Sequence, residues 1–241
     1  YDQSIKFLEK FQNNSKSNET PYYASSFYSL GYSYFRKENF VKAGNAFNEY
    51  SKKDNYFGAS KERYIDAMAR LGDCNFMQKK YEAAIDAYTY VITKNAANSD
   101  YAYFQIGMIR GLQENELQKI LTLKKIPQNY PNSLYVDDAL FEIALVQLEI
   151  GDYNEALRGF SYILADYPGS EFAKTCYLKI GLLKYRKEDI EGSIIAFKSV
   201  IEKFPKTRET DEAINVLETI YKEQGRVDEY FDYMAAQGGR F

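Results

Sequence analysis

One short pattern, an aromatic residue followed by Pro, any residue and then Ser or Thr, recurs along this chain at a constant interval. Its prolines are Pro131, Pro168 and Pro205, so each copy lies 37 residues after the one before. Self-similarity at a period of about 20–50 residues is the mark of a repeat architecture. The chain is therefore expected to be a stack of similar units rather than a single globule.

Other residues keep the same register when these segments are aligned. Small residues recur at Gly107, Ala144 and Gly181, again 37 apart. Earlier copies centre on Gly31 and Gly72, and a fainter copy follows near the end, so that six copies are separated by steps of 41, 35, 37, 37 and 37 residues. The faint copy is marked by Ile214, Leu217, Tyr221 and Gly225.

Each copy has the pattern of two helices. In the clearest copy one apolar stripe of helical spacing precedes "GDY" and a second stripe follows it. Gly151 in "GDY" can adopt the left-handed conformation that ends a helix. The first stripe is Leu140, Ile143 and Ala144, and the second is Ala156, Phe160 and Ile163.

The recurring residue types have mechanical reasons. A large side chain where two helices cross closely would hold them apart, so we expect the small residue of one helix to face a bulky residue of the other. Proline cannot continue the second helix. The Ser or Thr two residues later is expected to cap the following helix through its side-chain oxygen.

The pattern resembles the tetratricopeptide repeat (TPR), in which Leu-Gly is followed by Ala-x3-Phe and then Pro. Here "FYSLGYSY" with "AGNAF", and "MARLGDCN" with "AAIDAY", carry the resemblance. The TPR period is about 34 residues. The longer form with "YPNS" and "YPGS" is similar to TPR proteins of the Gram-negative cell envelope, such as the outer-membrane assembly lipoprotein BamD and the Tol–Pal accessory protein. The resemblance implies an all-α solenoid, a right-handed superhelix of about six helix pairs.

The repeats divide the chain into seven segments. The first segment, with Tyr1, Leu8 and Phe11 on one face, matches a second helix whose partner would lie upstream, so we expect a longer array. Copy three has Lys119 at a usually small position, which predicts an irregularity near residues 111–120. The segments are 1–16 (orphan second helix), 22–55, 62–98, 99–131 (degenerate), 132–168, 169–205 and 206–241 (degenerate).

Composition excludes several classes of function. The net charge of −3 arises from interspersed charges and gives no field to hold nucleic acid. No apolar run approaches the length of a membrane span. The chain has no histidine and no Gly-rich phosphate loop, so we predict no enzyme, no cofactor and no metal site. Cys74 and Cys176 are interpreted as packing residues, and Asp137 and Asp138 as first-turn acids that favour a helix dipole.

A binding surface is expected where the first helices of successive repeats lie side by side, as the TPR resemblance implies. The relevant positions lie three before and one after the small residue, hence on one helix face. They lack the Lys and Asn that clamp a terminal carboxylate in chaperone-tail TPR domains, at least in the first five copies. The candidate partner-binding residues are Tyr28, Tyr32, Tyr101, Phe104, Met108, Phe141, Leu145, Leu178 and Leu182.

Three interpretations of this strip remain open: it is core, it binds a peptide or helix of a partner, or it mediates self-association. We interpret the chain as a non-catalytic scaffold for protein partners, in a bacterial cell-envelope assembly of the periplasm or outer membrane. A cytoplasmic location is the alternative. A different class of function is a module that binds a glycan or peptidoglycan strand through its tyrosines. Sugar sites need Asn, Asp or Gln beside the aromatics, and the strip offers few of these.

Overall fold

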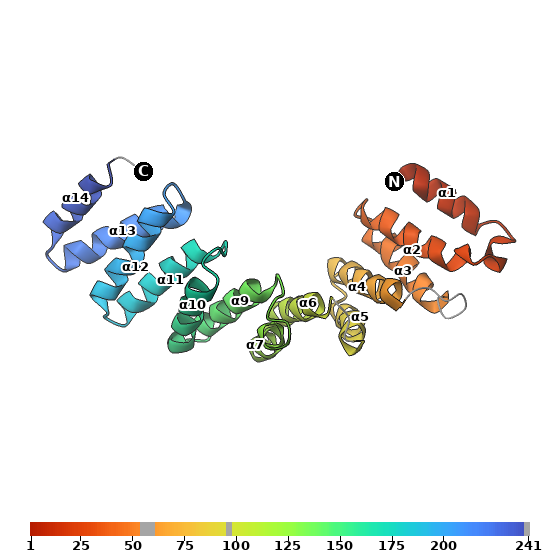
Figure 1. Ribbon diagram of the computed structural model, residues 1–241, viewed down its shortest axis with the longest axis horizontal. Helices are drawn as coiled ribbons and strands as arrows, with labels where there is room; N and C mark the ends of the chain where they lie inside the picture. The colour runs from red at the N-terminus through yellow and green to blue at the C-terminus, as the bar shows by residue number, and fades with distance from the viewer. Residues whose placement is uncertain (54–60, 95–97, 239–241) are drawn as a thin grey trace. The chain divides into compact units, whose positions relative to one another are not determined.

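A computed structural model describes residues 1–53, 61–94 and 98–238. Helices are the regular secondary structure of these ranges, which confirms the predicted all-α class (Figure 1). The bounds are α1 Asp2–Gln12, η1 Ser17–Glu19, α2 Tyr22–Phe35, α3 Phe40–Lys53, α4 Lys61–Met77, α5 Tyr81–Thr93, α6 Ser99–Leu112, α7 Glu116–Leu123, α8 Lys125–Asn129, α9 Val136–Glu149, α10 Tyr153–Asp166, α11 Ala173–Arg186, α12 Ile190–Lys203, α13 Arg208–Glu223 and α14 Val227–Ala236.

Consecutive helices form hairpins. After α1, the helix pairs begin with α2, α4, α6, α9, α11 and α13, and in each pair the first helix packs against the second. Within each of the two compact units described below, the second helix also packs against the first helix of the next pair: α3 on α4, α5 on α6, α10 on α11 and α12 on α13. We call the first helix of each pair the A helix and the second the B helix, and α1 is a B helix by its packing on α2.

The turn between A and B helices is the same in every pair. One residue, seven positions after the small residue, has a positive φ between 56° and 83°. Gly151, with φ of 83°, is one of them, so its predicted role is confirmed. The next residue caps the B helix when it is Asn or Asp, because its side-chain oxygen accepts an N–H of the first turn. Such caps are Asn39, Asn115, Asp152 and Asp189.

In the four copies with glycine at the small position, this residue lies against the large residue 16 positions later, as predicted. A Cβ atom built on Gly31 would lie 2.8 Å from the Phe47 ring, and one built on Gly181 would lie 2.7 Å from the Phe197 ring. Gly72 meets Tyr88 and Gly107 meets Leu123 in the same way. Close crossing of A and B helices therefore depends on the missing side chain.

The aromatic-Pro-x-Ser pattern ends one pair and begins the next, but its hydroxyls act in two ways. Thr207 caps α13 by accepting from the Thr210 N–H at 3.3 Å, as predicted. Ser133 and Ser170 instead accept from the N–H two residues later, at 3.0 and 3.2 Å, and so stabilise the turn that precedes the helix. The capping prediction was wrong for these two serines, because α9 and α11 begin three residues after them.

The predicted irregularity exists in copy three but lies further along the chain than residues 111–120. The B helix is broken at Lys124 into α7 and α8. Pro127 explains the position, because it has no N–H to bond the carbonyl of Leu123 and its ring clashes there. Gly111 accommodates Lys119: a Cβ built on this glycine would lie 2.9 Å from the Lys119 chain.

The chain forms two compact units, residues 1–135 and 136–241. Each unit has its own apolar clusters: the first unit holds those around Phe47 and Tyr88, and the second those around Phe160 and Phe197. Cys74 and Cys176 lie in these cores with no exposed surface, which confirms that they are packing residues. Among the described residues, no helix combines the length and apolarity that crossing a bilayer requires.

Candidate functional site

The predicted binding residues differ in burial. Phe141 and Leu178, both in the second unit, are buried in its core. The other seven are partly exposed: Tyr28, Tyr32, Tyr101, Phe104, Met108, Leu145 and Leu182. The core interpretation therefore describes two of the nine, and the accessible members gather mainly on α2 and α6 of the first unit.

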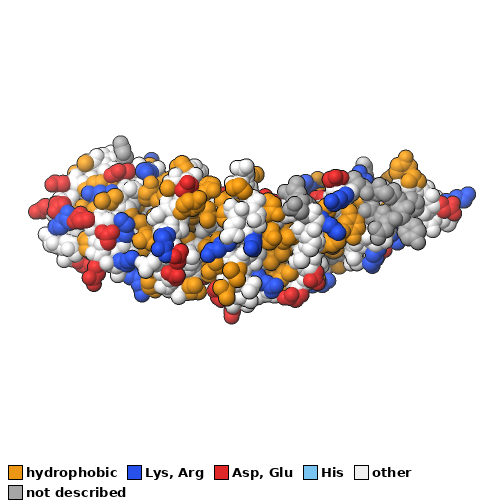
Figure 2. Space-filling view, turned by 60° about the horizontal axis from the view of Figure 1, so that its bottom comes forward, with side chains coloured by type: hydrophobic (Ala, Val, Ile, Leu, Met, Phe, Trp, Pro, Cys, Tyr) orange, Lys and Arg blue, Asp and Glu red, His pale blue; other side chains and the backbone are white. Residues whose placement is uncertain are grey.

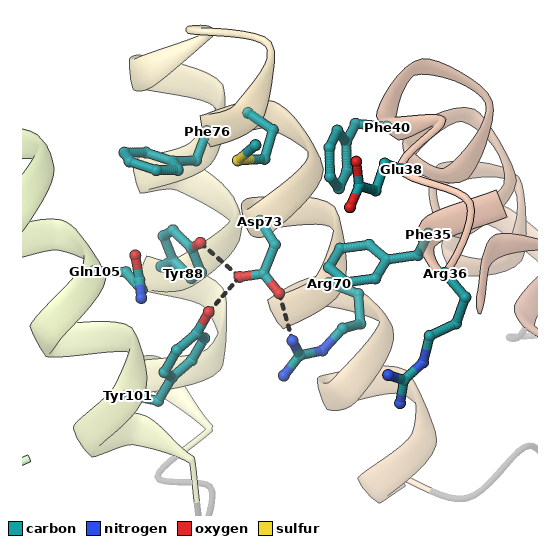
Figure 3. Close-up of a pocket in the computed structure, with 11 residues that line it drawn as sticks. Phe35, Arg36, Glu38, Phe40, Arg70, Asp73, Phe76, Tyr88, Tyr101 and Gln105 are labelled. Carbon is teal, nitrogen blue, oxygen red and sulfur yellow. Dashed lines mark hydrogen bonds and ion pairs between the residues drawn. The ribbon is translucent and has the colours of Figure 1, made fainter. Parts of the chain in front are cut away.

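A cleft of about 470 Å³ opens in the first unit over the exposed side of α4 (Figure 3). Helices α2 and α6 supply side chains on either side of α4, and α5 supplies Tyr88 from behind it. The lining is aromatic with polar groups among the rings: Phe35, Arg36, Glu38, Phe40, Arg70, Asp73, Phe76, Met77, Tyr88, Tyr101 and Gln105. We call it the α4 cleft.

Asp73 of α4 is the acceptor at the centre of the α4 cleft. Its Oδ1 accepts hydrogen bonds from the hydroxyls of Tyr88 and Tyr101, each at 2.7 Å, and Arg70 Nη1 donates to its Oδ2 (Figure 3). Asp73 as a whole is 7 % exposed. A charge buried this far is tolerated when it is paired and hydrogen-bonded, and here both oxygens are.

A second acid continues the network towards α2. Asp66 Oδ2 accepts from the hydroxyls of Tyr28 and Tyr32, at 2.7 and 2.5 Å. Arg70 lies between the two acids, with its Nε 3.7 Å from Asp66 Oδ1 and its guanidinium over the Tyr101 ring. Asp66, Arg70 and Asp73 therefore join α2, α4, α5 and α6 through a continuous set of hydrogen bonds and ion pairs.

Burial and the acids shift the pKa values of this network. Burial and the hydrogen bond to Asp66 raise the pKa of Tyr32 to about 12. Burial and the charge of Asp73 raise the pKa of Tyr88 well above that of an ordinary phenol. Burial alone would lower the pKa of the Arg70 guanidinium, but Asp73 and its neighbours raise it. The tyrosines are hence neutral donors, and Arg70 is a cation, at any physiological pH.

The network determines what the α4 cleft presents to a ligand. Tyr88 and Tyr101 direct their hydroxyls to Asp73. Tyr88 is fully buried, so only the partly exposed ring of Tyr101 remains for contact. Phe35 and Phe40 pack edge to face with their centroids 5.5 Å apart on the opposite side. Two cations, Arg36 and Arg70, balance the two acids Glu38 and Asp73 among the lining residues. Such a site suits apolar side chains flanked by polar backbone rather than a strongly charged ligand.

The A helices of the second unit present a different surface. Phe141 stacks on Phe172 with centroids 4.2 Å apart and an angle of 12° between the rings. Asp137 and Asp138 lie in the first turn of α9, as predicted, and burial together with neighbouring acids raises the pKa of Asp138. On the face shown in Figure 2, acidic and basic side chains are interspersed, which agrees with the small net charge.

The thiols are placed for packing rather than for reaction. Burial raises the pKa of Cys74 and of Cys176 to about 12, so both remain thiols at neutral pH. Because the thiolate is the nucleophilic form, neither is activated. Across the described ranges, no three or more His, Cys, Asp or Glu residues are grouped so that they could hold a metal ion.

Sequence reasoning missed much of this cleft. It named Tyr101 but not Arg70 or Gln105 of the lining, nor Asp66 beside it. Of Asn, Asp and Gln, the lining holds Asp73 and Gln105. The signal was available in the repeat register. Asp66 and Arg70 lie six and two residues before Gly72, and these positions face the preceding A helix. On that helix the hydroxyls of Tyr28 and Tyr32 donate hydrogen bonds to Asp66.

Helix hairpins that stack through a shared register of small and bulky residues define an α-helical repeat protein. Models of the tetratricopeptide repeat match residues 28–100, 138–170 and 175–207, together more than half of the chain. The chain therefore belongs to the tetratricopeptide-repeat proteins. None of the curated proteins matches its sequence.

Solved structures of TPR proteins share the fold at low identity. The C-terminal part of a TPR repeat-containing protein from Cytophaga hutchinsonii is 17% identical with a TM-score of 0.68, over 97% of this chain and 94% of that one. MamA is 18% identical with a TM-score of 0.61, over 76% and 93%. YrrB, described as a TPR protein with an unusual peptide-binding site, is 15% identical with a TM-score of 0.58, over 79% and 91%.

Proposed function

We propose that this protein is a non-catalytic scaffold that binds a segment of a partner protein in the α4 cleft. TPR proteins in general mediate protein–protein interactions. The observation that carries the proposal is the Asp73 network, which holds the rings of Tyr88 from α5 and Tyr101 from α6 in fixed positions beside an open cleft. A surface that is ordered before binding loses less side-chain entropy when a ligand arrives.

The chemistry of the cleft favours a peptide over an ion or a nucleotide. Phe35, Phe40 and Phe76 offer apolar contact area, and aromatic residues are the usual hot spots of interfaces. Gln105 and Arg36 on the rim can hydrogen-bond the backbone of an extended or helical segment. The charges of the lining balance, so we expect binding that depends only weakly on salt.

A glycan or peptidoglycan strand is the second candidate ligand. Its supporting observation is the presence of Gln105, Glu38 and Arg36 around aromatic rings, a combination that can bind sugar hydroxyls. The peptide is favoured because the strongest acceptor, Asp73, is already occupied by Tyr88, Tyr101 and Arg70. Binding of the protein to immobilised peptidoglycan would favour the glycan instead, if the substitution Gln105→Ala abolishes that binding.

We also propose a role in a bacterial cell-envelope assembly, in the periplasm or at the outer membrane. The support is limited to the two "YPNS" and "YPGS" segments, which are similar to those of envelope TPR proteins. Fractionation of the producing cells, with antibodies against the protein, tests this location. Recovery of the protein solely in the cytoplasmic fraction would contradict it.

Site-specific photo-crosslinking tests the α4 cleft directly. Met77 lines the cleft and is 54 % exposed, so a benzophenone amino acid can replace it without loss of core packing. Ile195, 65 % exposed on α12 of the second unit, provides the matched control position. We expect one recurrent protein adduct from position 77 that is absent from position 195. The same adducts at both positions, or none at 77, would exclude the cleft as the binding surface.

A further inference from the structure

The α4 cleft contains polar side chains of two kinds. Those of the Asp73 network bond to one another, and both oxygens of Asp73 are in use. Three others, Arg36, Glu38 and Gln105, line the same cleft, and their side chains form no hydrogen bond or ion pair with another described residue. These three therefore determine which polar groups of a ligand the cleft can bind.

The unused amide of Gln105 follows from its place in the repeat. Gln105 takes the position on α6 that Arg70 takes on α4, two residues before the small residue. Asp66 and Asp73, one turn to each side on α4, pair with Arg70. On α6 the corresponding positions hold a tyrosine and a methionine, so no carboxylate is there to bind Gln105. Its amide lies on the α6 side of the cleft and is available to a ligand (Figure 3).

An amide side chain matches the peptide groups of a ligand. The Gln105 side chain has a carbonyl oxygen that accepts and an NH2 group that donates, so it can bond both an N–H and a C=O of one stretch of backbone. In a helix these backbone groups are already bonded to one another, four residues apart. Along an extended segment that no strand covers they are unpaired. Gln105 therefore favours an extended backbone over a helical one.

The size of the α4 cleft leads to the same form. One turn of helix, about 10 Å wide and about 5.4 Å long, fills about 420 Å³. The cleft has a volume of about 470 Å³, so it would hold a single turn. A helix of fewer than about 12 residues is marginal in water, so most of a stable helix would lie outside the cleft. An extended segment advances about 3.3 Å per residue and can place several residues along α4.

The apolar part of the cleft is suited to one large side chain. Phe35 and Phe40 pack edge to face with their centroids 5.5 Å apart, and Phe76 and Met77 line the cleft from α4. Successive side chains of an extended segment point in opposite directions, so one residue can enter while its two neighbours point away. A single aromatic or long aliphatic residue is therefore the expected anchor of the ligand.

The two unpaired charges lie on the α2 side of the cleft. Glu38 lies beside Phe40 in Figure 3. Arg36 lies nearer to Arg70, on the other side of Phe35. A segment along α4 with a basic residue towards Glu38 and an acidic residue towards Arg36 has complementary charges. Both side chains are exposed, so each pair should change the affinity by only about two- to five-fold, and mainly fixes the direction of the segment.

We propose that the partner segment in the α4 cleft is extended, with its backbone bonded to the amide of Gln105 and one large apolar side chain among the phenylalanines. A basic residue on one side of this apolar residue pairs with Glu38, and an acidic residue on the other side pairs with Arg36. The inference rests on the proposed function, because it specifies the ligand of the same cleft. It goes further in excluding a helix as the bound form.

Linear nine-residue peptides supply the probe. They are selected from a random phage-displayed library against the 241-residue protein, and the library favours neither backbone form. A selected peptide is a cleft ligand if Met77→Glu weakens its binding at least five-fold in fluorescence anisotropy and Ile195→Glu does not. The two residues are 54 and 65 % exposed, so neither substitution should change the melting temperature. A selection without any cleft ligand would contradict the proposed function of the cleft and this proposal with it.

Replacement of single peptide amides by esters tests the bond to Gln105. An ester lacks the N–H and is a weaker acceptor, so at one position it should weaken binding about three- to ten-fold. The same ester should have no further effect on Gln105→Ala, because the partner of that group is already lost. Gln118→Ala removes an exposed amide from α7 and is the matched control, which should preserve the ester effect. Equal ester effects in wild type and Gln105→Ala at every position would overturn the proposal.

A helical form of the same peptide tests the backbone conformation. A lactam bridge between residues four apart holds a peptide in a helix, because these residues are neighbours on one helix face. The bridged peptide should bind at least ten-fold more weakly than the peptide with the same two residues unjoined. A bridged peptide that binds as tightly, and is still weakened by Met77→Glu, would overturn the extended form. The α4 cleft would remain the binding site in that case.

Reversal of charge tests the direction of the segment. Glu38→Lys should weaken binding of a cleft ligand about two- to five-fold, and replacement of the basic residue of the peptide by Glu should restore it. The turn should tolerate this substitution, because Lys79 has a φ of 59° at the corresponding position, close to the 57° of Glu38. Cleft ligands without opposite charges about the apolar residue, or no restoration, would overturn the assignment of the charges.

Photo-crosslinking from position 77 identifies the molecule that supplies the segment. The protein is purified from the cells that produce it, in its full length. An adduct with a second protein, through a segment that has the predicted pattern of charges and apolar residue, is the expected result. A crosslink within the chain itself would place a segment of the same protein in the cleft and overturn the assignment to a partner.

Discussion

The contact between a missing side chain and a ring is the residue-scale feature on which the hairpins depend. Gly181 faces Phe197 so closely that a Cβ would lie 2.7 Å from the ring. Copy four has Ala144 at this position, but Gly159 of α10 lies against it, where the other well-formed copies have alanine. One methyl group has in effect moved from the B helix to the A helix, and the volume between the helices is conserved.

The substitution Gly181→Ala is therefore expected to destabilise the protein. The added methyl overpacks the crossing, which typically costs about 1–3 kcal/mol. Alanine recovers about 0.5–1 kcal/mol of this through its better helix propensity. We expect a net loss of about 1–2 kcal/mol in urea unfolding, and partial recovery in the double variant Gly181→Ala, Ala196→Gly. Gly169→Ala is the control, because nothing lies within 4 Å of its Cβ site. Equal stability of the Gly181 and Gly169 variants would refute the close-contact argument.

A second residue-scale prediction concerns the cap of α5. Lys80 stands where Asn39, Asp152 and Asp189 cap their helices, and its side chain makes no capping bond. Lys80→Asp should supply the missing acceptor and a favourable charge at the helix N-terminus, worth about 1 kcal/mol. The melting temperature should rise by about 2–4 °C for a chain of this size. Asp152→Ala should lower it, and a fall with Lys80→Asp would show that this turn differs from the others.

The sequence predicted the contacts that repeat and missed those that do not. The pairing of Gly31 with Phe47 follows from a pattern present in several copies, so one sequence suffices to find it. The Asp73 network occurs once, because only the second copy has an acid one residue after its small residue. Its partners Tyr88 and Tyr101 lie 15 and 28 residues away, on other helices. Only packing in three dimensions brings the three together.

At the scale of elements, the acids of α4 connect it to three other helices. Asp66 accepts a hydrogen bond from Tyr32 of α2. Asp73 accepts hydrogen bonds from Tyr88 of α5 and Tyr101 of α6. Each hydrogen bond to a charged acceptor contributes about 1.5–3 kcal/mol when buried, and less where water reaches it. The network therefore orients neighbouring helices as well as fixing side chains that line the α4 cleft. The sequence located these helices, but it placed the break of copy three too early, because the effect of Pro127 was not weighed.

This network predicts loss of stability in alkali. The folded-state pKa of Tyr32 is raised to about 12, above an unfolded value near 10, by burial and its bond to Asp66. A raised folded pKa gives stability that is fully present below pH 10 and is lost as the pH rises towards 12, because the unfolded state releases its protons first. Absorbance at 295 nm should show a first group of tyrosines ionising near pH 10. The rest should ionise together with the loss of helical circular dichroism. Ionisation of all tyrosines near pH 10, with the helices intact, would contradict the network.

Within each of the two units, packing is between neighbouring helices. The apolar clusters around Phe47 and Tyr88 belong to residues 1–135, and those around Phe160 and Phe197 to residues 136–241. In repeat proteins stability is close to a sum of repeat and nearest-neighbour terms. The period of 37 residues predicts this organisation, whereas the boundary near Tyr135 has no clear mark in the sequence.

The second unit should consequently fold by itself. The fragment 136–241 retains three helix pairs and two complete apolar clusters, and about three repeats are enough for a stable stack. We expect helical circular dichroism and one cooperative thermal transition. Gly181→Ala should cost the fragment the same 1–2 kcal/mol, within error, that it costs the full chain, because its contacts with Phe197 are all inside this unit. In the fragment 1–135, the effect of Lys80→Asp should likewise equal that in the full chain. A fragment 136–241 that is helical but melts without a cooperative transition would show that its core needs the first unit to form.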